Sequence, residues 1–164
     1  MTRQILQWPD KRLTETAQNI TKINDDIRAV WDEMILVMDA MPGVGLAATQ
    51  LGEMRRLAVV DASDARGEAI RMANPEVLHS SVEIREDWES SPCLPGVSAK
   101  IKRPRGLTVR FMNAEGEIED RDLVGLWAVS TFHQIDHLAG RMYFDNLSRL
   151  KRDRLLKRAK KLTR

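Results

Sequence analysis

The sequence predicts an α+β fold in a single domain spanning residues 1–164. Two observations support this prediction. A chain of 164 residues suits one compact domain that buries its own core. Segments with strand character mostly precede two late helical segments, whereas a parallel sheet would require strands and helices to alternate along the chain.

The first half of the chain contains one predicted helix and two predicted strands. Residues 24–40 predict an amphipathic helix, because their apolar side chains recur at three- and four-residue steps, and Asn24 suits its N-cap. Residues 57–61 form a short apolar run rich in β-branched side chains, which predicts a buried strand. Residues 71–75 predict a second strand that stops at Pro75.

The second half predicts a hairpin followed by two helices. Residues 107–112 alternate in polarity, and a turn at 113–116 leads into residues 117–120, as in a β-hairpin. Residues 124–139 predict an apolar helix. Residues 148–162, within the C-terminal segment 148–164, predict a basic helix with a leucine-rich stripe.

Composition predicts a cytoplasmic protein. Cys93 is the only cysteine, so the chain forms no internal disulfide, which suits a reducing compartment. The first nine residues lack the apolar run of a secretory signal. No segment approaches the roughly 18 apolar residues that a membrane-spanning helix requires.

Positive charge is concentrated at the C-terminus. Residues 149–164 carry nine basic side chains against the single acid Asp153, a net +8, although the whole chain carries only +2. Such a segment suits the phosphates of RNA. A solvated surface helix is the simpler alternative, and an anionic membrane surface is less favoured because the helix has no aromatic anchor.

The apolar helix contains two histidines at a spacing typical of metal ligands. In His133-Gln134-Ile135-Asp136-His137 the imidazoles are four residues apart and share one helix face, so both can reach one ion. Zinc hydrolases use His-Glu-x-x-His in this way, with the glutamate handling protons. Here Gln134 stands in that position. Two ordinary helix histidines are the alternative.

A small-residue segment provides a second motif. It reads Gly43-Val44-Gly45-Leu46-Ala47-Ala48-Thr49-Gln50. The two glycines allow close approach of a ligand to the backbone, and the Gln50 amide offers a donor and an acceptor. By itself the segment is equally compatible with a loop that enters a strand.

The two motifs together resemble the peptide deformylase family. Gly-x-Gly-φ-Ala-Ala-x-Gln near residue 50 is followed about eighty residues later by His-x-x-Asp-His. The resemblance covers nearly the whole chain and includes Pro9-Asp10-x-x-Leu13, Asn74-Pro75 and the basic C-terminal helix. It implies a single-domain deformylase fold with mixed antiparallel sheets around a central metal-site helix.

This resemblance also implies a reaction and its ligands. Deformylases remove the formyl group from the N-terminal formyl-methionine of nascent chains, using Fe(II) or Zn(II) held by two histidines and one cysteine. It implies that His133 and His137 bind the metal and that Gln50 stabilises the oxyanion. The implied methionine pocket consists of Val44, Gly45 and Leu46. The family's C-terminal helix docks onto the ribosome, which implies the same partner for residues 148–164.

The third ligand is where this chain departs from the family. The family reads Glu-Gly-Cys-Leu-Ser-x-Pro, whereas this chain reads Glu89-Ser90-Ser91-Pro92-Cys93-Leu94-Pro95. A gapless alignment places Ser91 at the cysteine position and keeps the usual separation from the first histidine. A two-residue slip uses Cys93 instead. The gapless alignment is favoured, and both remain open.

Three chemical groups are altered in the gapless alignment. Ser91 is a hard, normally protonated hydroxyl in place of a thiolate. Gln134 cannot transfer protons, and loss of a general base costs about 10²- to 10⁴-fold in rate. Pro92 lacks the backbone N–H that would hold the oxyanion, a loss of roughly 10²- to 10³-fold.

We therefore expect weak or absent metal binding and impaired or lost deformylation, as in a pseudoenzyme. Two alternatives remain. One is an active metallohydrolase that uses Cys93 as a ligand. The other is a non-catalytic module that binds formyl-methionyl peptides or the ribosome.

Overall fold

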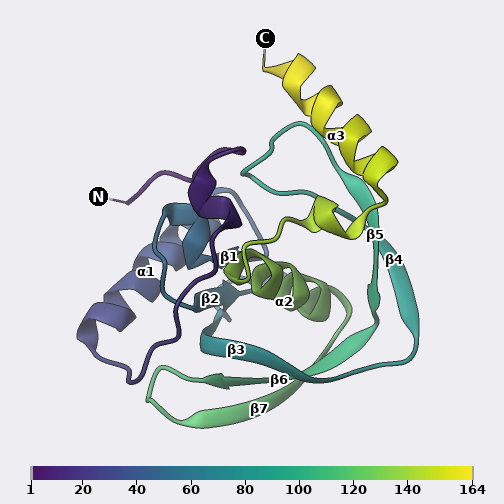
Figure 1. The fold of residues 1–164 in the computed structure, drawn as a ribbon. Helices are drawn as coiled ribbons and strands as arrows, with labels where there is room; N and C mark the ends of the chain where they lie inside the picture. The colour runs from purple at the N-terminus through teal and green to yellow at the C-terminus, as the bar shows by residue number, and fades with distance from the viewer. Residues whose placement is uncertain (1, 164) are drawn as a thin grey trace.

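A five-stranded antiparallel sheet forms the centre of the computed structural model, which describes residues 2–163 (Figure 1). Its strands follow the order β1-β2-β3-β6-β7. They comprise β1 (Gly45–Ala47), β2 (Leu57–Val60), β3 (Ile70–Ser80), β6 (Gly106–Met112) and β7 (Ile118–Val124). A second sheet pairs β4 (Ile84–Glu89) with β5 (Ala99–Pro104). The α+β prediction is confirmed.

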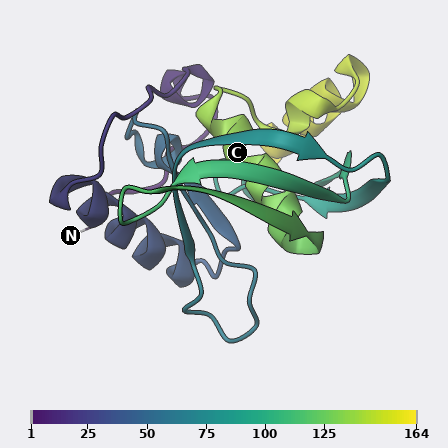
Figure 2. The same cartoon turned by 90° about the horizontal axis from the view of Figure 1, so that it is seen from below.

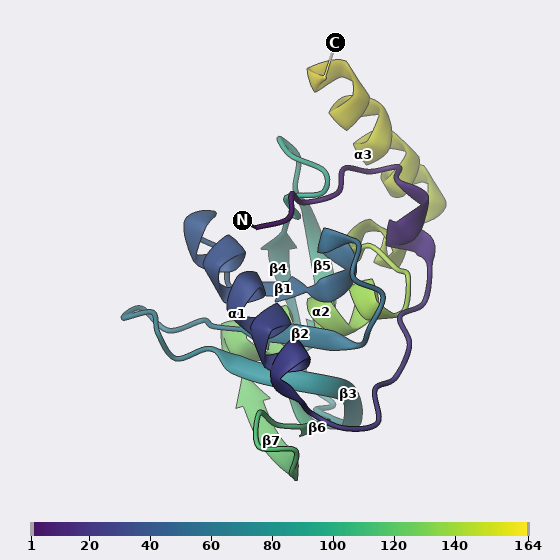
Figure 3. The ribbon, with the colours of Figure 1, turned by 90° about the vertical axis from the view of Figure 1, so that its left-hand side faces the viewer.

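Two helices cover opposite faces of the central sheet. Helix α1 (Asp25–Ala40) lies in front of β1 and β2 in Figure 3, and α2 (Gly125–Leu138) lies behind them. Helix α1 begins where predicted, because the Asn24 side chain accepts a hydrogen bond from the Ile27 amide at 2.9 Å. Seen from below, the long strands β3, β6 and β7 run across α2 (Figure 2).

The prediction that a strand stops at Pro75 was wrong. Strand β3 continues to Ser80 and pairs with β6 on both sides of the proline. Its register shifts between Ala73 and Glu76, and Asn74 adopts a positive φ of 51°. A bulge of this kind accommodates a residue that cannot donate to the ladder.

The C-terminal segment folds back and then leaves the body of the protein. The short helix η3 (Tyr143–Asn146) follows α2, and α3 (Arg149–Leu162) projects from the domain (Figure 1). Of the predicted leucine-rich stripe, Leu155 and Ala159 are buried, whereas Leu150 and Leu162 are each 60% exposed. Two further short helices, η1 (Lys11–Thr14) and η2 (Ala48–Leu51), complete the fold. Among residues 2–163, no helix is both long and apolar enough to cross a membrane.

Candidate active site

A cavity of about 320 Å³ lies between the segment that precedes β1, the end of β4 and helix α2. Both sequence motifs contribute to it. Val44, Gly45 and Gln50 line it from the glycine segment, and His133 and Gln134 line it from α2. Trp88 and Leu126 also line it and are 65% and 53% exposed. The fold therefore brings together two motifs that are far apart in the sequence.

The two histidines of α2 point at one another. Their Nε2 atoms are 3.2 Å apart, as the four-residue spacing predicts. His137 is fully buried, and its burial, together with the nearby His133 and Arg103, lowers its pKa well below the ordinary value. His137 is therefore neutral, and its Nδ1 atom has no hydrogen-bond partner among the described residues.

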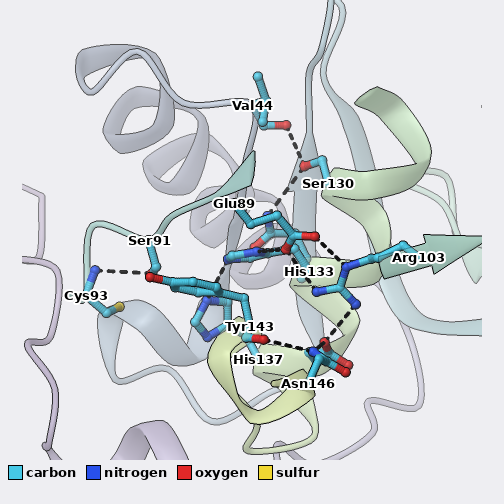
Figure 4. A network of polar contacts seen from close by, with 12 residues as sticks. Val44, Glu89, Ser91, Cys93, Arg103, Ser130, His133, His137, Tyr143 and Asn146 are labelled. Atoms are coloured by element: carbon cyan, nitrogen blue, oxygen red, sulfur yellow. Dashed lines mark hydrogen bonds and ion pairs between the residues drawn. The ribbon is translucent and has the colours of Figure 1, made fainter. Parts of the chain in front are cut away.

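Glu89, at the end of β4, orients His133. Its carboxylate accepts a hydrogen bond from His133 Nδ1 at 2.9 Å and two from Arg103, at 2.7 and 2.9 Å (Figure 4). Burial alone would raise the pKa of Glu89, but the bonds from His133 and Arg103 outweigh burial and lower it. Because Glu89 is ionised, Nδ1 of His133 is the donor in this bond, and Nε2 faces His137.

Arg103 extends this network to α2. Its Nη1 atom donates to the Asp136 carboxylate at 3.0 Å, and its side chain is only 7% exposed. One guanidinium therefore connects the end of β4 with the residue that precedes His137. Such a buried connection fixes side-chain geometry, because every charged group in it requires its partners.

Residues Ser91–Leu94 form a tight turn beside the histidines. The Leu94 amide bonds the Ser91 carbonyl at 3.0 Å, with Pro92 at the second position, where proline is favoured. The Ser91 hydroxyl accepts a hydrogen bond from the Cys93 amide at 3.2 Å. Pro92 lines the cavity but has no N–H to offer a ligand.

The Cys93 thiol lies against Gln50. Gln50 Nε2 is 3.5 Å from Cys93 Sγ, and Gln50 Oε1 accepts a hydrogen bond from the Ala47 amide at 2.9 Å. Cys93 is 1% exposed within a hydrophobic cluster that includes Leu94. Its burial raises the pKa of the thiol above the ordinary value despite hydrogen bonds from Gln50 and Ser91. The thiol is therefore protonated.

Gln134 lies at the base of the cavity with one amide atom unpaired. Its Nε2 atom donates to Ser130 Oγ at 3.4 Å, and Ser130 Oγ donates to the Val44 carbonyl at 2.8 Å. The hydroxyl has given its only proton to Val44, so it must accept from Gln134. Gln134 Oε1 is buried and has no hydrogen-bond donor among the described residues. An unpaired buried acceptor costs about 1–3 kcal/mol.

Gly45 allows Gln134 to approach this closely. A Cβ atom at Gly45 would lie 2.3 Å from Ser130 Oγ and 2.5 Å from Gln134 Nε2. Leu46, which was expected in the pocket, does not line the cavity. Its side chain is fully buried in the cluster that α1 covers, because successive side chains of a strand point to opposite faces.

A family model described as polypeptide deformylase matches residues 2–153. The chain belongs to the peptide deformylase family. It is 39% identical to the peptide deformylase of Afipia carboxidovorans over 158 residues, 95% of this chain and 92% of that protein. It is also 39% identical to peptide deformylase 1 of Burkholderia multivorans, covering 98% of this chain and 88% of the relative.

Solved deformylase structures share the fold. The peptide deformylase of Legionella pneumophila superposes with a TM-score of 0.92 at 31% identity, covering 99% of this chain and 96% of that one. A deformylase of Ehrlichia chaffeensis in complex with actinonin gives 0.91 at 30% identity, with 99% and 98% coverage. The predicted single-domain deformylase fold is confirmed.

Deformylases depend on a metal ion, and this chain fits one only in part. Two nitrogens bound to zinc at about 2.0–2.1 Å in a tetrahedron lie roughly 3.3 Å apart, close to the 3.2 Å between His133 and His137. A catalytic zinc site has three protein ligands. Among residues 2–163, no group of three or more His, Cys, Asp or Glu side chains could hold an ion. The ligand set is therefore incomplete.

Two residues of the site were not predicted as functional. In the sequence, Glu89 is a residue that matches the family motif in the gapless alignment, and Arg103 belongs to no motif. A signal for Arg103 exists, because it lies two residues after the buried Ile101 and therefore on the same face of β5. The sequence does not indicate which carboxylate an inward-facing arginine would meet.

Tyr143 lies beside His133. Its ring stacks on His133 with centroids 5.8 Å apart and an interplanar angle of 16°. Burial, and to a lesser degree Glu89, raises the pKa of its phenol to about 12, so the hydroxyl is neutral. The ring thus packs against one face of the His133 imidazole.

Proposed function

We propose that this member of the deformylase family binds formyl-methionyl chains in its cavity and hydrolyses them very slowly or not at all. The observation that carries the proposal is the incomplete ligand set. The Nε2 atoms of His133 and His137 are 3.2 Å apart, and among the described residues no third His, Cys, Asp or Glu is placed to hold an ion together with them.

The gapless alignment supports this proposal. Glu89, which that alignment keeps in register, bonds His133 directly. Ser91 follows it by two residues and is buried. Cys93 packs in the hydrophobic cluster with its thiol against Gln50. We therefore assign Ser91 to the family's cysteine position.

The proton-transfer group is changed as well. Gln134 occupies the position between the histidines, and an amide neither takes nor returns a proton. Loss of a general base costs about 10²- to 10⁴-fold, and an absent oxyanion donor at Pro92 costs roughly 10²- to 10³-fold. The costs need not multiply, since such groups act as a unit.

Features that would hold a peptide are retained. Gly45 lines the cavity, and its lack of a side chain makes room for Ser130 and Gln134 in the cavity wall. Apolar side chains of Met41, Val44 and Val129 line it and suit a methionine side chain. Gln50 is available to contact the formyl oxygen.

The test combines metal analysis with a deformylase assay. Mass spectrometry would measure Fe and Zn in the native protein and in the triple variant Ser91→Cys/Pro92→Leu/Gln134→Glu. We expect less than one metal per chain in the native protein and about one in the variant. Hydrolysis of formyl-Met-Ala-Ser should rise by at least about 10²-fold in the variant.

A matched control uses the neighbouring serine. The variant Ser90→Cys/Pro92→Leu/Gln134→Glu carries the same number of thiols, but its new thiol stands at an exposed residue one position away. It should gain neither metal nor activity. Native protein that contains stoichiometric metal and turns over formyl-Met-Ala-Ser like its relatives would overturn the proposal.

Helix α3 is proposed to contact ribosomal RNA. Leu155 and Ala159 anchor it to the domain, and its basic side chains lie on a helix that projects away from the body (Figure 1). Cationic groups on such a helix bind the phosphates of RNA independently of the RNA sequence. Contact between α3 and ribosomal RNA would place the cavity near nascent chains that emerge from the ribosome.

A further inference from the structure

The mouth of the cavity exposes two large apolar side chains. Trp88, near the end of β4, and Leu126, at the start of α2, both line the cavity and are 65% and 53% exposed. Large apolar side chains that stay open to water beside a cavity are typical of a surface that a ligand covers. A peptide whose methionine side chain occupies the cavity would leave it across these two residues.

A lysine lies over the indole of Trp88. Strands β4 and β5 pair antiparallel with Lys100 directly opposite Trp88, and the Lys100 ammonium is 5.5 Å from the centroid of the Trp88 ring. An ammonium group over an indole face gains about 0.5–1 kcal/mol at an exposed site. The contact therefore holds a positive charge beside the cavity wall.

No carboxylate of the described residues is paired with this charge. Glu89 is the one acidic side chain among the described residues that line the cavity, and both of its oxygens are bonded to Arg103. Glu86, on the same face of β4 as Trp88, lies directly opposite Lys102 and not Lys100. The ion pairs of the β4–β5 sheet within residues 2–163 join Arg85 to Asp87 and Arg103 to Glu89 and Asp136.

We propose that Lys100, held over Trp88 at the mouth of the cavity, makes the site favour peptides with acidic side chains at the two positions that follow the methionine. An extended chain advances about 3.3 Å per residue, so the first two residues outside the cavity are the ones within reach of Lys100. The inference rests on the proposed function, because it assumes that formyl-methionyl chains enter this cavity. It adds a preference for one class of chain.

The test measures binding of three peptides to the full-length protein by isothermal titration calorimetry in a low-salt buffer. They are formyl-Met-Asp-Asp, formyl-Met-Asn-Asn and formyl-Met-Lys-Lys, each amidated at the C-terminus so that side-chain charge is the main difference. We expect the Asp-Asp peptide to bind about two- to fivefold more tightly than the Asn-Asn peptide, the effect of one exposed ion pair. The Lys-Lys peptide should bind most weakly. The preference should disappear in about 1 M salt, where charges are screened beyond about 3 Å.

Three variants identify Lys100 as the cause. Lys100→Gln should bind the Asp-Asp and Asn-Asn peptides equally, and Lys100→Glu should bind the Lys-Lys peptide most tightly. Lys102→Gln is the matched control, because it removes the same charge from the same face of β5 at a residue that faces Glu86. It should keep the native preference. Both lysines are exposed, and circular dichroism would establish that all three variants are folded.

The outcomes separate this inference from the proposed function. If native protein binds the three peptides equally, or if Lys100→Gln keeps the preference, the role of Lys100 is wrong while formyl-peptide binding stands. An equal loss of preference in Lys102→Gln would also overturn that role, because overall charge would then explain the effect. If native protein binds none of the three peptides, the proposed function itself fails.

Discussion

Replacing Arg103 with methionine should strongly destabilise the fold. The guanidinium and the Glu89 carboxylate are 7% and 4% exposed and share bonds of 2.7 and 2.9 Å. Methionine keeps much of the length of the side chain but leaves Glu89 buried with His133 as its remaining partner. Removing one member of a buried pair costs about 3–5 kcal/mol.

This loss is large relative to the stability of a typical domain, about 5–15 kcal/mol. With a urea dependence of about 2 kcal/mol per molar, the unfolding midpoint should fall by roughly 1.5–2.5 M. Urea unfolding followed by circular dichroism measures the shift. The double variant Arg103→Met/Glu89→Gln should recover part of the loss, because it removes the unpaired charge as well.

Arg105, two residues after Arg103, forms an exposed ion pair that serves as a control. Arg105 bonds Glu83 at 3.1 Å, but these side chains are 55% and 63% exposed. Arg105→Met should cost less than about 1 kcal/mol, as for other exposed pairs. Equal midpoint shifts in Arg103→Met and Arg105→Met would refute the reasoning that burial makes the Arg103 network costly to break.

The same network predicts a pH dependence. The pKa of Glu89 lies below its ordinary value of 4.5 in the folded protein. Its contribution to stability is therefore fully present above pH 4.5 and is lost as the pH falls through the lower folded pKa. Urea midpoints should decline over that acidic range more steeply in the native protein than in Glu89→Gln.

Three further changes probe the cavity and the basic helix. Gly45→Ala should lower stability by about 1–3 kcal/mol in thermal unfolding, because its Cβ would lie 2.3 Å from Ser130 Oγ; an unchanged melting temperature would contradict this packing. Cys93→Ser should leave metal content unchanged, because the thiol contacts Gln50; loss of stoichiometric metal would instead favour a hydrolase that uses Cys93. Replacing Lys157, Lys160 and Lys161 with glutamine should reduce the salt dependence of RNA binding by about 0.7–0.9 in logarithmic slope for each phosphate that is no longer neutralised, and an unchanged slope would place the RNA-binding surface elsewhere.

Local patterns in the sequence determined most of the elements. Apolar side chains at helical spacing predicted α1 and α3, and an apolar segment predicted α2, each to within a residue or two of its observed bounds. The turn at 113–116 predicted the β6–β7 hairpin, which pairs throughout. The spacing of His133 and His137 determined that their imidazoles would lie on one helix face, since four residues make slightly more than one helical turn.

The continuation of β3 past Pro75 could not be predicted from the local sequence. A missing N–H normally interrupts a ladder, but β3 pairs with β6 on both sides of Pro75 and accommodates the proline with a bulge. Leu46 is a second case. Its neighbours in sequence line the cavity, but its direction was decided by the pleat of β1 and by the core beneath α1.

The candidate site was also determined partly by the sequence and partly by the tertiary structure. The sequence by itself identified the family motifs and the departures at Ser91, Pro92 and Gln134. Only the tertiary structure joined Glu89 to Arg103 and His133, placed Cys93 against Gln50, and left one amide oxygen of Gln134 without a partner among the described residues. Hydrogen bonds between distant segments depend on how sheets and helices pack, and no local periodicity specifies them.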